Sequence, residues 1–225
     1  LQPFAISHLV NKIMSDDSDI VVFDFYSDEE NKGIGSGLCD KVSLLKNNEE
    51  CIHGLAELWF PVTAWSKFLK KSFIEHNQLE FKEGIINEDA PWTFQVCLAA
   101  NSIAFLNEKL YYYRYNPNSI MSTKKQKNMN KAGLYTLQMM KRKLDGRTDL
   151  TGNKDAYLIW MRQIVLFYTR VFNHSDFKTF VAFCNKLDYL KVSFSKQIVP
   201  PLYYKLWNLV FKLPNCIKPL VLGSI

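Results

Sequence analysis

The run Asp-Ile-Val-Val-Phe-Asp-Phe-Tyr at residues 19–26 constrains the fold more than any other stretch of the chain. It is mostly apolar, β-branched and aromatic, which predicts a strand buried on both faces, as in an α/β sheet. Before it, Phe4, Leu9, Val10 and Ile13 are spaced as one face of a helix. A helix that leads into a buried strand predicts an α/β domain.

Further helices and strands are expected along the first 122 residues. We expect helices over residues 41–60, with a break near Gly54, and over residues 62–77, the second with Trp65 facing inward and Lys67 facing outward. Residues 79–89 predict a short extended stretch.

We expect another helix over residues 90–102, followed by two short strands within residues 103–115, on either side of Asn107 and Glu108. Beyond residue 122 the pattern is helical. The chain is therefore predicted to have an α/β lobe at residues 1–122 and a helical subdomain at residues 123–225.

Composition supports a globular protein with two differently charged halves. Hydrophobic residues make up 48% of the 225 and charged residues 22%, which is typical of a chain that forms a core. Residues 1–115 carry a net charge of −7 and residues 116–225 a net charge of +13. The five cysteines form no CxxC or Cys/His cluster, so we expect reduced thiols and no zinc site. No nucleic-acid-binding motif accompanies the basic residues, so no nucleic-acid partner is expected.

The pair Glu88-Asp89 opens the predicted helix over residues 90–102, and it has two interpretations. Asn87 or Asp89 can cap the helix, with Pro91 in the first turn, where a missing N–H costs nothing. Alternatively, a carboxylate held where an extended segment enters a helix can serve as a general base, because such a base must be positioned before its pKa matters. The two interpretations are compatible.

Several motifs together resemble one known family. They are Ala-Trp-Ser-Lys-Phe-Leu at residues 64–69, Phe-Lys-Glu-Gly-Ile at 81–85, Asn-Glu-Asp at 87–89, and Tyr-Tyr-Arg leading to Asn-Ser-Ile-Met at 112–121. In combination they resemble the second half of a bacterial family 2 glycosyltransferase of GT-A fold, of the type that builds capsular and other surface polysaccharides. The resemblance covers roughly residues 1–122.

The resemblance implies a role for several residues. Asp89 matches the proposed catalytic base, Glu88 would support it or bind the acceptor, and Trp65 would line the sugar pocket or simply pack in the core. Other residues of the implied substrate site, with donors suited to diphosphate or acceptor oxygens, are Arg114, Asn118 and Ser119. Arg114 has a structural alternative, an ion pair with Glu88. Tyr111, Tyr113 and Tyr115 share one strand face by alternation, which is typical of sheet packing.

The resemblance also implies a nucleotide-sugar donor, a glycan or lipid-linked acceptor, and Mg²⁺ or Mn²⁺. The Asp-x-Asp metal motif and the nucleotide-binding half would precede Leu1, so we expect no metal site in this chain. Asp17-Ser18-Asp19 precedes its strand, whereas metal ligands of such a fold follow one. Because the chain begins at Leu1 and inside a helical pattern, we expect a fragment of a longer inverting glycosyltransferase.

The basic C-terminal segment, residues 200–225, has two open interpretations. Lys205, Asn208 and Lys212 form one narrow polar stripe on an otherwise apolar helix, which suits either a membrane interface or packing onto neighbouring helices. We therefore expect a cytoplasmic protein, with peripheral contact to the inner face of the plasma membrane as one option. The alternative function is a non-catalytic helical module that docks on membranes or partner proteins.

Overall fold

The structure is a computed structural model that describes residues 1–27, 38, 42–114, 116, 118, 135, 136, 138–140, 142 and 143. The chain divides into two compact units, Leu1–Lys125 and Gln126–Ile225. The described residues of the second unit, between positions 135 and 143, are helical. The other helices expected after residue 122, including that at residues 200–225, lie outside the described residues.

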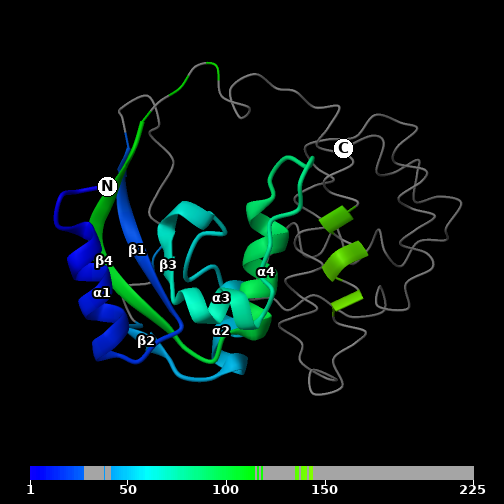
Figure 1. The fold of residues 1–225 in the computed structure, drawn as a ribbon, viewed down its shortest axis with the longest axis horizontal. Coiled ribbons are helices and arrows are strands. Elements are labelled where there is room, and N and C mark those ends of the chain that lie inside the picture. The colour runs from blue at the N-terminus through cyan, green and yellow to red at the C-terminus, as the bar shows by residue number, and fades with distance from the viewer. Residues whose placement is uncertain are drawn as a thin grey trace, which may run out of the picture. The chain divides into compact units, whose positions relative to one another are not determined.

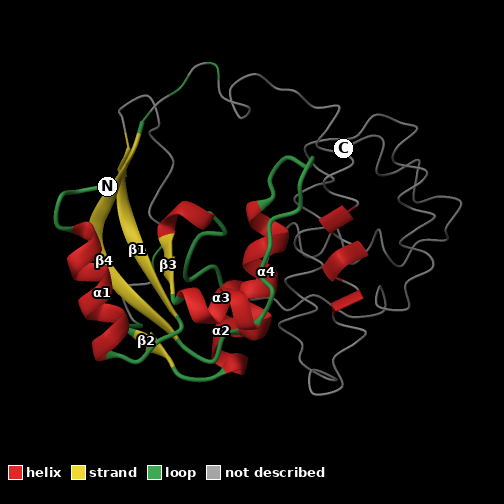
Figure 2. Cartoon of the chain, viewed as in Figure 1, coloured by secondary structure: helices red, strands yellow, loops and turns green. Residues whose placement is uncertain are grey.

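The first unit is a mixed α/β structure, as predicted (Figures 1 and 2). In chain order its elements are α1 (Ala5–Ser15), β1 (Ile20–Ser27), β2 (Leu44–Leu45), α2 (Asn48–Ala56), a 3₁₀ turn η2 (Ala64–Ser66), β3 (Lys67–Leu69), α3 (Lys71–His76), α4 (Asp89–Ala99) and β4 (Ile103–Tyr113). The sheet order is β2-β4-β1-β3. β1 and β4 are parallel, while β2 and β3 run antiparallel to their neighbours.

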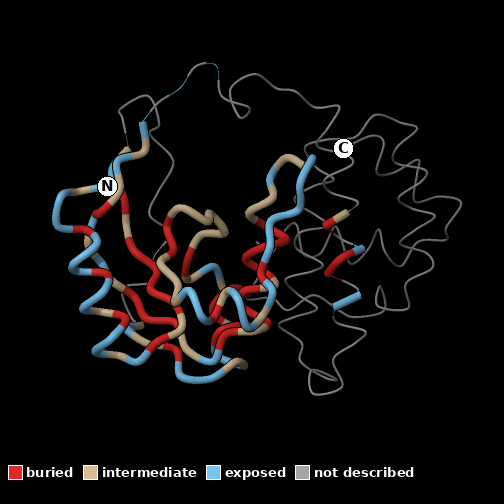
Figure 3. Tube along the Cα trace, in the orientation of Figure 1, coloured by how far each residue is buried: buried red, intermediate tan, exposed pale blue. Residues whose placement is uncertain are grey.

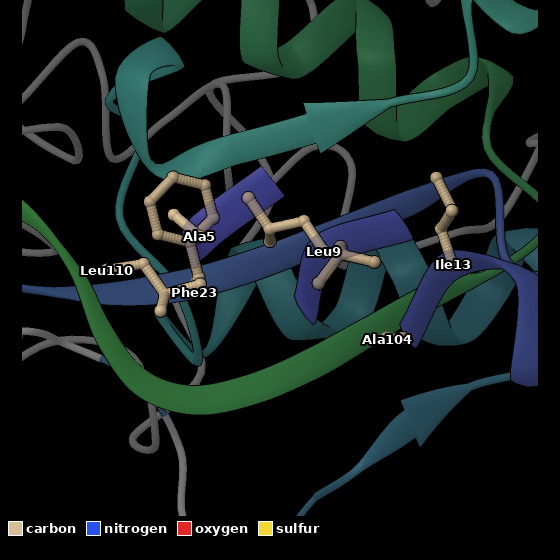
Figure 4. Close-up of a cluster of buried hydrophobic side chains, with 7 residues drawn as sticks. Ala5, Leu9, Ile13, Phe23, Ala104 and Leu110 are labelled. Atoms are coloured by element: carbon tan, nitrogen blue, oxygen red, sulfur yellow. The ribbon is translucent and has the colours of Figure 1, made fainter. Parts of the chain in front are cut away.

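Strand β1 lies inside the sheet and is covered on both faces. Ile20, Val21 and Val22 are all 0% exposed, which explains the unbroken apolar run in the sequence. Because side chains alternate along a strand, Val21 and Phe23 point to the face that α1 covers. There they pack with Ala5, Leu9, Ile13, Ala104 and Leu110 (Figure 4).

Helices α2 and α4 cover the opposite face of the sheet (Figure 1). Figure 3 shows that most of α4 is buried, and its Phe94 and Val96 are at most 1% exposed. Phe105 of β4 meets Phe60 on this side, with ring centroids 5.9 Å apart. The sheet therefore separates two apolar layers, one beneath α1 and one beneath α2 and α4.

Two details of the predicted helical face and strands are corrected. Leu9 and Ile13 are buried as expected, but Phe4 and Val10 are 48% and 41% exposed. Residues 103–113 form one continuous strand, not two. Its register against β1 jumps from Phe23↔Leu106 to Asp24↔Lys109, so the chain bulges at Asn107-Glu108, where a break was predicted.

The single helix predicted over residues 62–77 is wrong. The segment forms the η2 turn, strand β3 and the short helix α3. Phe68 and Leu69 suit a helical or an extended pattern equally well, and pairing with Val21 and Ile20 of β1 decides for the strand. Likewise, the helix predicted over residues 41–60 is shorter, because Leu44 and Leu45 form β2.

One side chain joins the start of α2 to the end of α4. Asn48 Nδ2 donates to the backbone carbonyls of Cys97, Leu98 and Ala100 at 2.9, 3.1 and 2.9 Å. The last carbonyls of a helix have no partner within the helix, so this amide supplies one from a neighbouring helix. It fixes the end of α4 and, through it, the direction in which α4 approaches the sheet.

We predict that Asn48→Ala lowers the free energy of unfolding by about 1–3 kcal/mol, because it leaves partly buried carbonyls without a donor. Urea unfolding followed by circular dichroism measures the change. The matched control is Glu49→Ala, an exposed neighbour on the same helix, which should change stability by less than about 0.5 kcal/mol. Equal effects of the two substitutions would contradict the assignment.

Candidate active site

Asp89 is the first residue of α4, and its side chain is half-buried. The chain enters the helix through Asn87, whose φ of 63° lies in the left-handed region that asparagine tolerates better than most residues. Glu88 occupies the N-cap position but makes no side-chain capping hydrogen bond. The expected cap by Asn87 or Asp89 is therefore not formed, and the Asp89 carboxylate is directed elsewhere.

The Asp89 carboxylate faces the η2 turn, where it accepts a hydrogen bond from the backbone N–H of Ala64. Burial raises the pKa of Asp89, and the neighbouring Glu88 carboxylate raises it further. The Ala64 hydrogen bond and the Lys67 ammonium act in the opposite direction. The net shift is upward, so this carboxylate is a stronger base than a solvated aspartate.

Several hydrogen bonds hold the segment 61–66 that faces Asp89. Thr93 Oγ1, one turn along α4 from Asp89, donates to the Val62 carbonyl at 2.6 Å. Ser66 Oγ lies 2.8 Å from Thr63 Oγ1 and donates to the Thr63 carbonyl at 2.9 Å. Residues on both sides of Ala64 are thus fixed, so its N–H has a defined direction toward Asp89.

The prediction that Lys67 faces outward is wrong. Lys67 is buried, with 8% of its surface exposed. It pairs with Val22 across the sheet, and paired residues project to the same face, here the one that α4 covers. Its Nζ donates to the carbonyls of Pro61 and Thr63 at 2.6 and 2.7 Å. Burial lowers the pKa of Lys67 to about 8, although nearby acidic groups, Cys97 and Asp89, raise it.

Trp65 joins the η2 turn to the far end of the central strands. Its ring stacks on Tyr111 and Tyr113, with centroids 4.9 and 5.3 Å away and interplanar angles of 24° and 23°. Phe25 meets Trp65 edge-on at 4.8 Å. Tyr111 and Tyr113 therefore share one face, as the alternation predicted, and Trp65 is half-buried against both.

The remaining predicted site residues are not brought to Asp89 by any contact in the described part of the chain. Arg114 is exposed at the end of β4, and the ion pair considered between Arg114 and Glu88 is not formed. Asn118 is exposed, and its backbone N–H donates to Asn116 Oδ1 at 3.0 Å. Ser119 and Tyr115 lie outside the described residues. The site that the structure assembles thus consists of Asp89, the η2 turn and Lys67.

Asp17 and Asp19 have structural partners. Asp17 Oδ1 accepts from Lys70 Nζ at 2.8 Å. Asp19 Oδ2 accepts from the backbone N–H groups of Asn101 and Ser102 at 2.9 and 3.2 Å, which ties the start of β1 to the start of β4. Within the described ranges no group of three His, Cys, Asp or Glu side chains fits a metal ion. The contacts of Asp17 and Asp19 are therefore structural.

Two contributors were missed by the sequence analysis. The donor to Asp89 is a backbone N–H, which no side-chain pattern can reveal. The segment before Asp89 is held by Phe81, whose ring stacks on Trp92 of α4 at 4.6 Å and 17°. Nothing in the spacing of Phe81 and Trp92 along the sequence indicates this contact.

Comparison with known proteins shows similarity to glycosyltransferases. The chain is 28% identical over 123 residues to Glycosyltransferase GlyA of Streptococcus pneumoniae serotype 4, a match that covers 51% of this chain and 17% of GlyA. No family model matches the chain.

Among solved structures, the chain is similar to Staphylococcus aureus TarS 1-349. The match to TarS 1-349 with UDP-GlcNAc has a TM-score of 0.55 and 13% identity, and covers 98% of this chain and 64% of that one. The match to TarS 1-349 alone has a TM-score of 0.56 and 12% identity, and covers 99% and 63%. At this identity the likeness concerns the fold alone, and it confirms the predicted α/β class as the glycosyltransferase fold of TarS. In the described ranges, no helix combines the length and the apolar character that crossing a membrane requires.

We predict that Asp89→Asn makes the fold more stable at neutral pH. Because folding raises the pKa of Asp89 above the ordinary aspartate value of 3.8, the protonated form is favoured in the fold and the ionised form is penalised. The stabilisation that the protonated Asp89 gives the fold is fully present below pH 3.8. It is lost as pH rises through the raised pKa. Asparagine keeps an acceptor for Ala64 and carries no charge.

Thermal unfolding across pH measures this effect. The melting temperature of Asp89→Asn should exceed that of the wild type at pH 7, and the difference should shrink as pH falls below the raised pKa. A wild type that is the more stable at pH 7, or a difference that does not depend on pH, would show that the Asp89 carboxylate is not penalised by burial.

Proposed function

We propose that this chain is the acceptor-side part of an inverting glycosyltransferase, and that Asp89 is its general base. The observation that carries the proposal is the fixed carboxylate of Asp89, half-buried and held by the Ala64 N–H beside Trp65. The similarity to GlyA and the TarS fold support the reaction class. The TarS structures with UDP-GlcNAc and with UDP support a nucleotide-sugar donor.

The chemistry is a single displacement. Asp89 takes the proton of an acceptor hydroxyl while the oxygen forms a bond to the anomeric carbon of the donor sugar. The bond from that carbon to the diphosphate oxygen breaks, and the nucleoside diphosphate leaves with the electron pair. Attack from the face opposite the leaving group inverts the anomeric configuration.

The environment of Asp89 suits this role. A general base works best when its pKa lies near the working pH, and burial together with Glu88 moves the pKa of Asp89 upward. The Ala64 hydrogen bond fixes one direction of the carboxylate, which leaves its remaining lone pairs for the acceptor. Position and basicity are thus set by the same few contacts.

The other predicted residues retain proposed roles. Trp65, stacked on Tyr111 and Tyr113, offers an aromatic group beside the segment that orients Asp89. Glu88 supports Asp89 or binds the acceptor. Donors for diphosphate or acceptor oxygens are proposed at Arg114, Asn118 and Ser119. Membership of glycosyltransferase family 2, a glycan or lipid-linked acceptor of surface-polysaccharide synthesis, and a divalent cation remain proposals drawn from the sequence motifs.

We predict that Asp89→Asn, in the protein at its full natural length, lowers kcat by about 100- to 10,000-fold, the usual contribution of a general base. Binding of the nucleotide sugar should be nearly unchanged. Release of nucleoside diphosphate with acceptor measures turnover, and calorimetry measures donor binding. The matched control is Asp17→Asn, whose carboxylate is 96% exposed and lies in the turn before β1, and it should keep full activity. Normal turnover of Asp89→Asn would remove the mechanism and favour the non-catalytic docking module.

We further propose that residues 200–225 contact the inner face of the plasma membrane, in keeping with a cytoplasmic enzyme that uses a lipid-linked acceptor. The support is the Lys205, Asn208 and Lys212 stripe in the sequence. We predict that vesicles containing anionic lipid sediment with the chain, and that deletion of residues 200–225 removes this binding. Neutral vesicles are the control. Equal binding with and without the segment would contradict membrane contact through it.

A further inference from the structure

Lys67 is unusual because its charge is buried without an ion pair to any other residue that the structure describes. Lysine is almost never fully buried unless paired, since removing an ammonium group from water is costly. Lys67 is 8% exposed, and among the described residues it forms no ion pair. Its hydrogen-bond partners are instead the carbonyls of Pro61 and Thr63, and its Nζ lies 5.8 Å from the centre of the Phe60 ring. An arrangement this costly calls for a reason in the surrounding structure.

The partners of Lys67 all belong to the segment that positions Asp89. Pro61 and Thr63 flank Val62, whose carbonyl accepts from Thr93 of α4. Thr63 is followed at once by Ala64, the N–H donor to Asp89. The Lys67 ammonium group therefore binds two carbonyls of one short loop. The second of them belongs to Thr63, the residue directly before Ala64, which faces the Asp89 carboxylate.

Within the described part of the chain, the charged and titratable groups that act on Lys67 come from α4. They are Asp89 and Cys97, and Glu88 adjoins Asp89. Burial raises the pKa of the Cys97 thiol to about 12, so it is uncharged at neutral pH. Asp89 is then the anion that interacts with the Lys67 charge, and the interaction is mutual: Lys67 lowers the pKa of Asp89 and Asp89 raises that of Lys67.

We propose that Lys67 is a positioning residue for Asp89: anchored on the carbonyls of Pro61 and Thr63, its buried ammonium fixes the loop that leads into Ala64 and faces the Asp89 carboxylate. The inference rests on the proposed function of Asp89. It gives a role to Lys67 of strand β3, which acts through Asp89 of helix α4 and does not itself touch the substrate.

The test uses Lys67→Met in the protein at its full natural length, because methionine keeps the buried stem and removes the charge and the donors. The matched control is Lys71→Met, four residues along, whose side chain is 87% exposed. We expect Lys67→Met to lower kcat by about 10- to 100-fold, the scale of a misplaced catalytic group, with little change in KM. Lys71→Met should leave both unchanged.

Three further readouts separate positioning from general stability. Without the Lys67 charge, the acidic limb of the kcat/KM profile should move to higher pH, because Asp89 loses a group that lowers its pKa. Carbon-13 NMR of labelled aspartate should show the same upward movement in the absence of any substrate. Hydrogen exchange at the Ala64 amide should become faster than in the wild type. If Lys67→Met does not unfold cooperatively, Lys67→Gln takes its place, since it keeps an N–H₂ donor without the charge.

The outcomes are distinct from those that test the function. An unchanged acidic limb, unchanged Asp89 titration and unchanged exchange at Ala64 would overturn the role of Lys67, even if Asp89→Asn is inactive. If Asp89→Asn instead keeps full activity, the proposed function fails. The NMR titration and the exchange rate then still decide whether Lys67 holds the Asp89 carboxylate.

Discussion

The pairing of β1 with β4 on one side and β3 on the other is the constraint on which the rest of this unit depends. Because β1 is parallel to β4, their apolar runs present two faces that must both be covered, and α1 covers one while α2 and α4 cover the other. Because β3 pairs with the start of β1, Lys67 lies beside Val22 on the face under α4. The sheet register therefore brings the lysine to the helix that carries Asp89.

The buried charges of the candidate site lower the stability of the fold. Burial penalises the charges of both Asp89 and Lys67, and the neighbouring Glu88 adds repulsion to Asp89. Packing elsewhere in the unit offsets this unfavourable free energy. The first three residues of β1 are fully buried, and Asn48 holds the C-terminal end of α4. Such buried charges are expected at a catalytic site, because taking a carboxylate partly out of water both fixes its position and raises its basicity.

Much of this framework could be predicted from the sequence, and the failures have physical causes. The strand at residues 20–27 is marked by an unbroken apolar run, the helix at 89–99 by the acidic pair and the proline at its start, and the tyrosine face of β4 by its alternation. The segment 62–77 does not, because Phe68 and Leu69 fit a helix or a strand, and only the tertiary pairing with β1 decides. The prediction for Lys67 failed for the same reason, because a helix over residues 62–77 would place its side chain on the solvent face. The orientation of Asp89 depends on a backbone N–H from a loop 25 residues earlier in the chain, and residue types carry no signal for such a contact.

The proposed mechanism requires the Asp89 carboxylate to contact an acceptor hydroxyl. A crystal structure of the protein at its full natural length, with nucleoside diphosphate and an acceptor analogue, measures this directly. We expect an acceptor hydroxyl at about 2.6–3.2 Å from an Asp89 oxygen, with the Ala64 N–H on the same carboxylate. An acceptor bound with its reacting hydroxyl far from Asp89, and nearer to another base, would contradict the account.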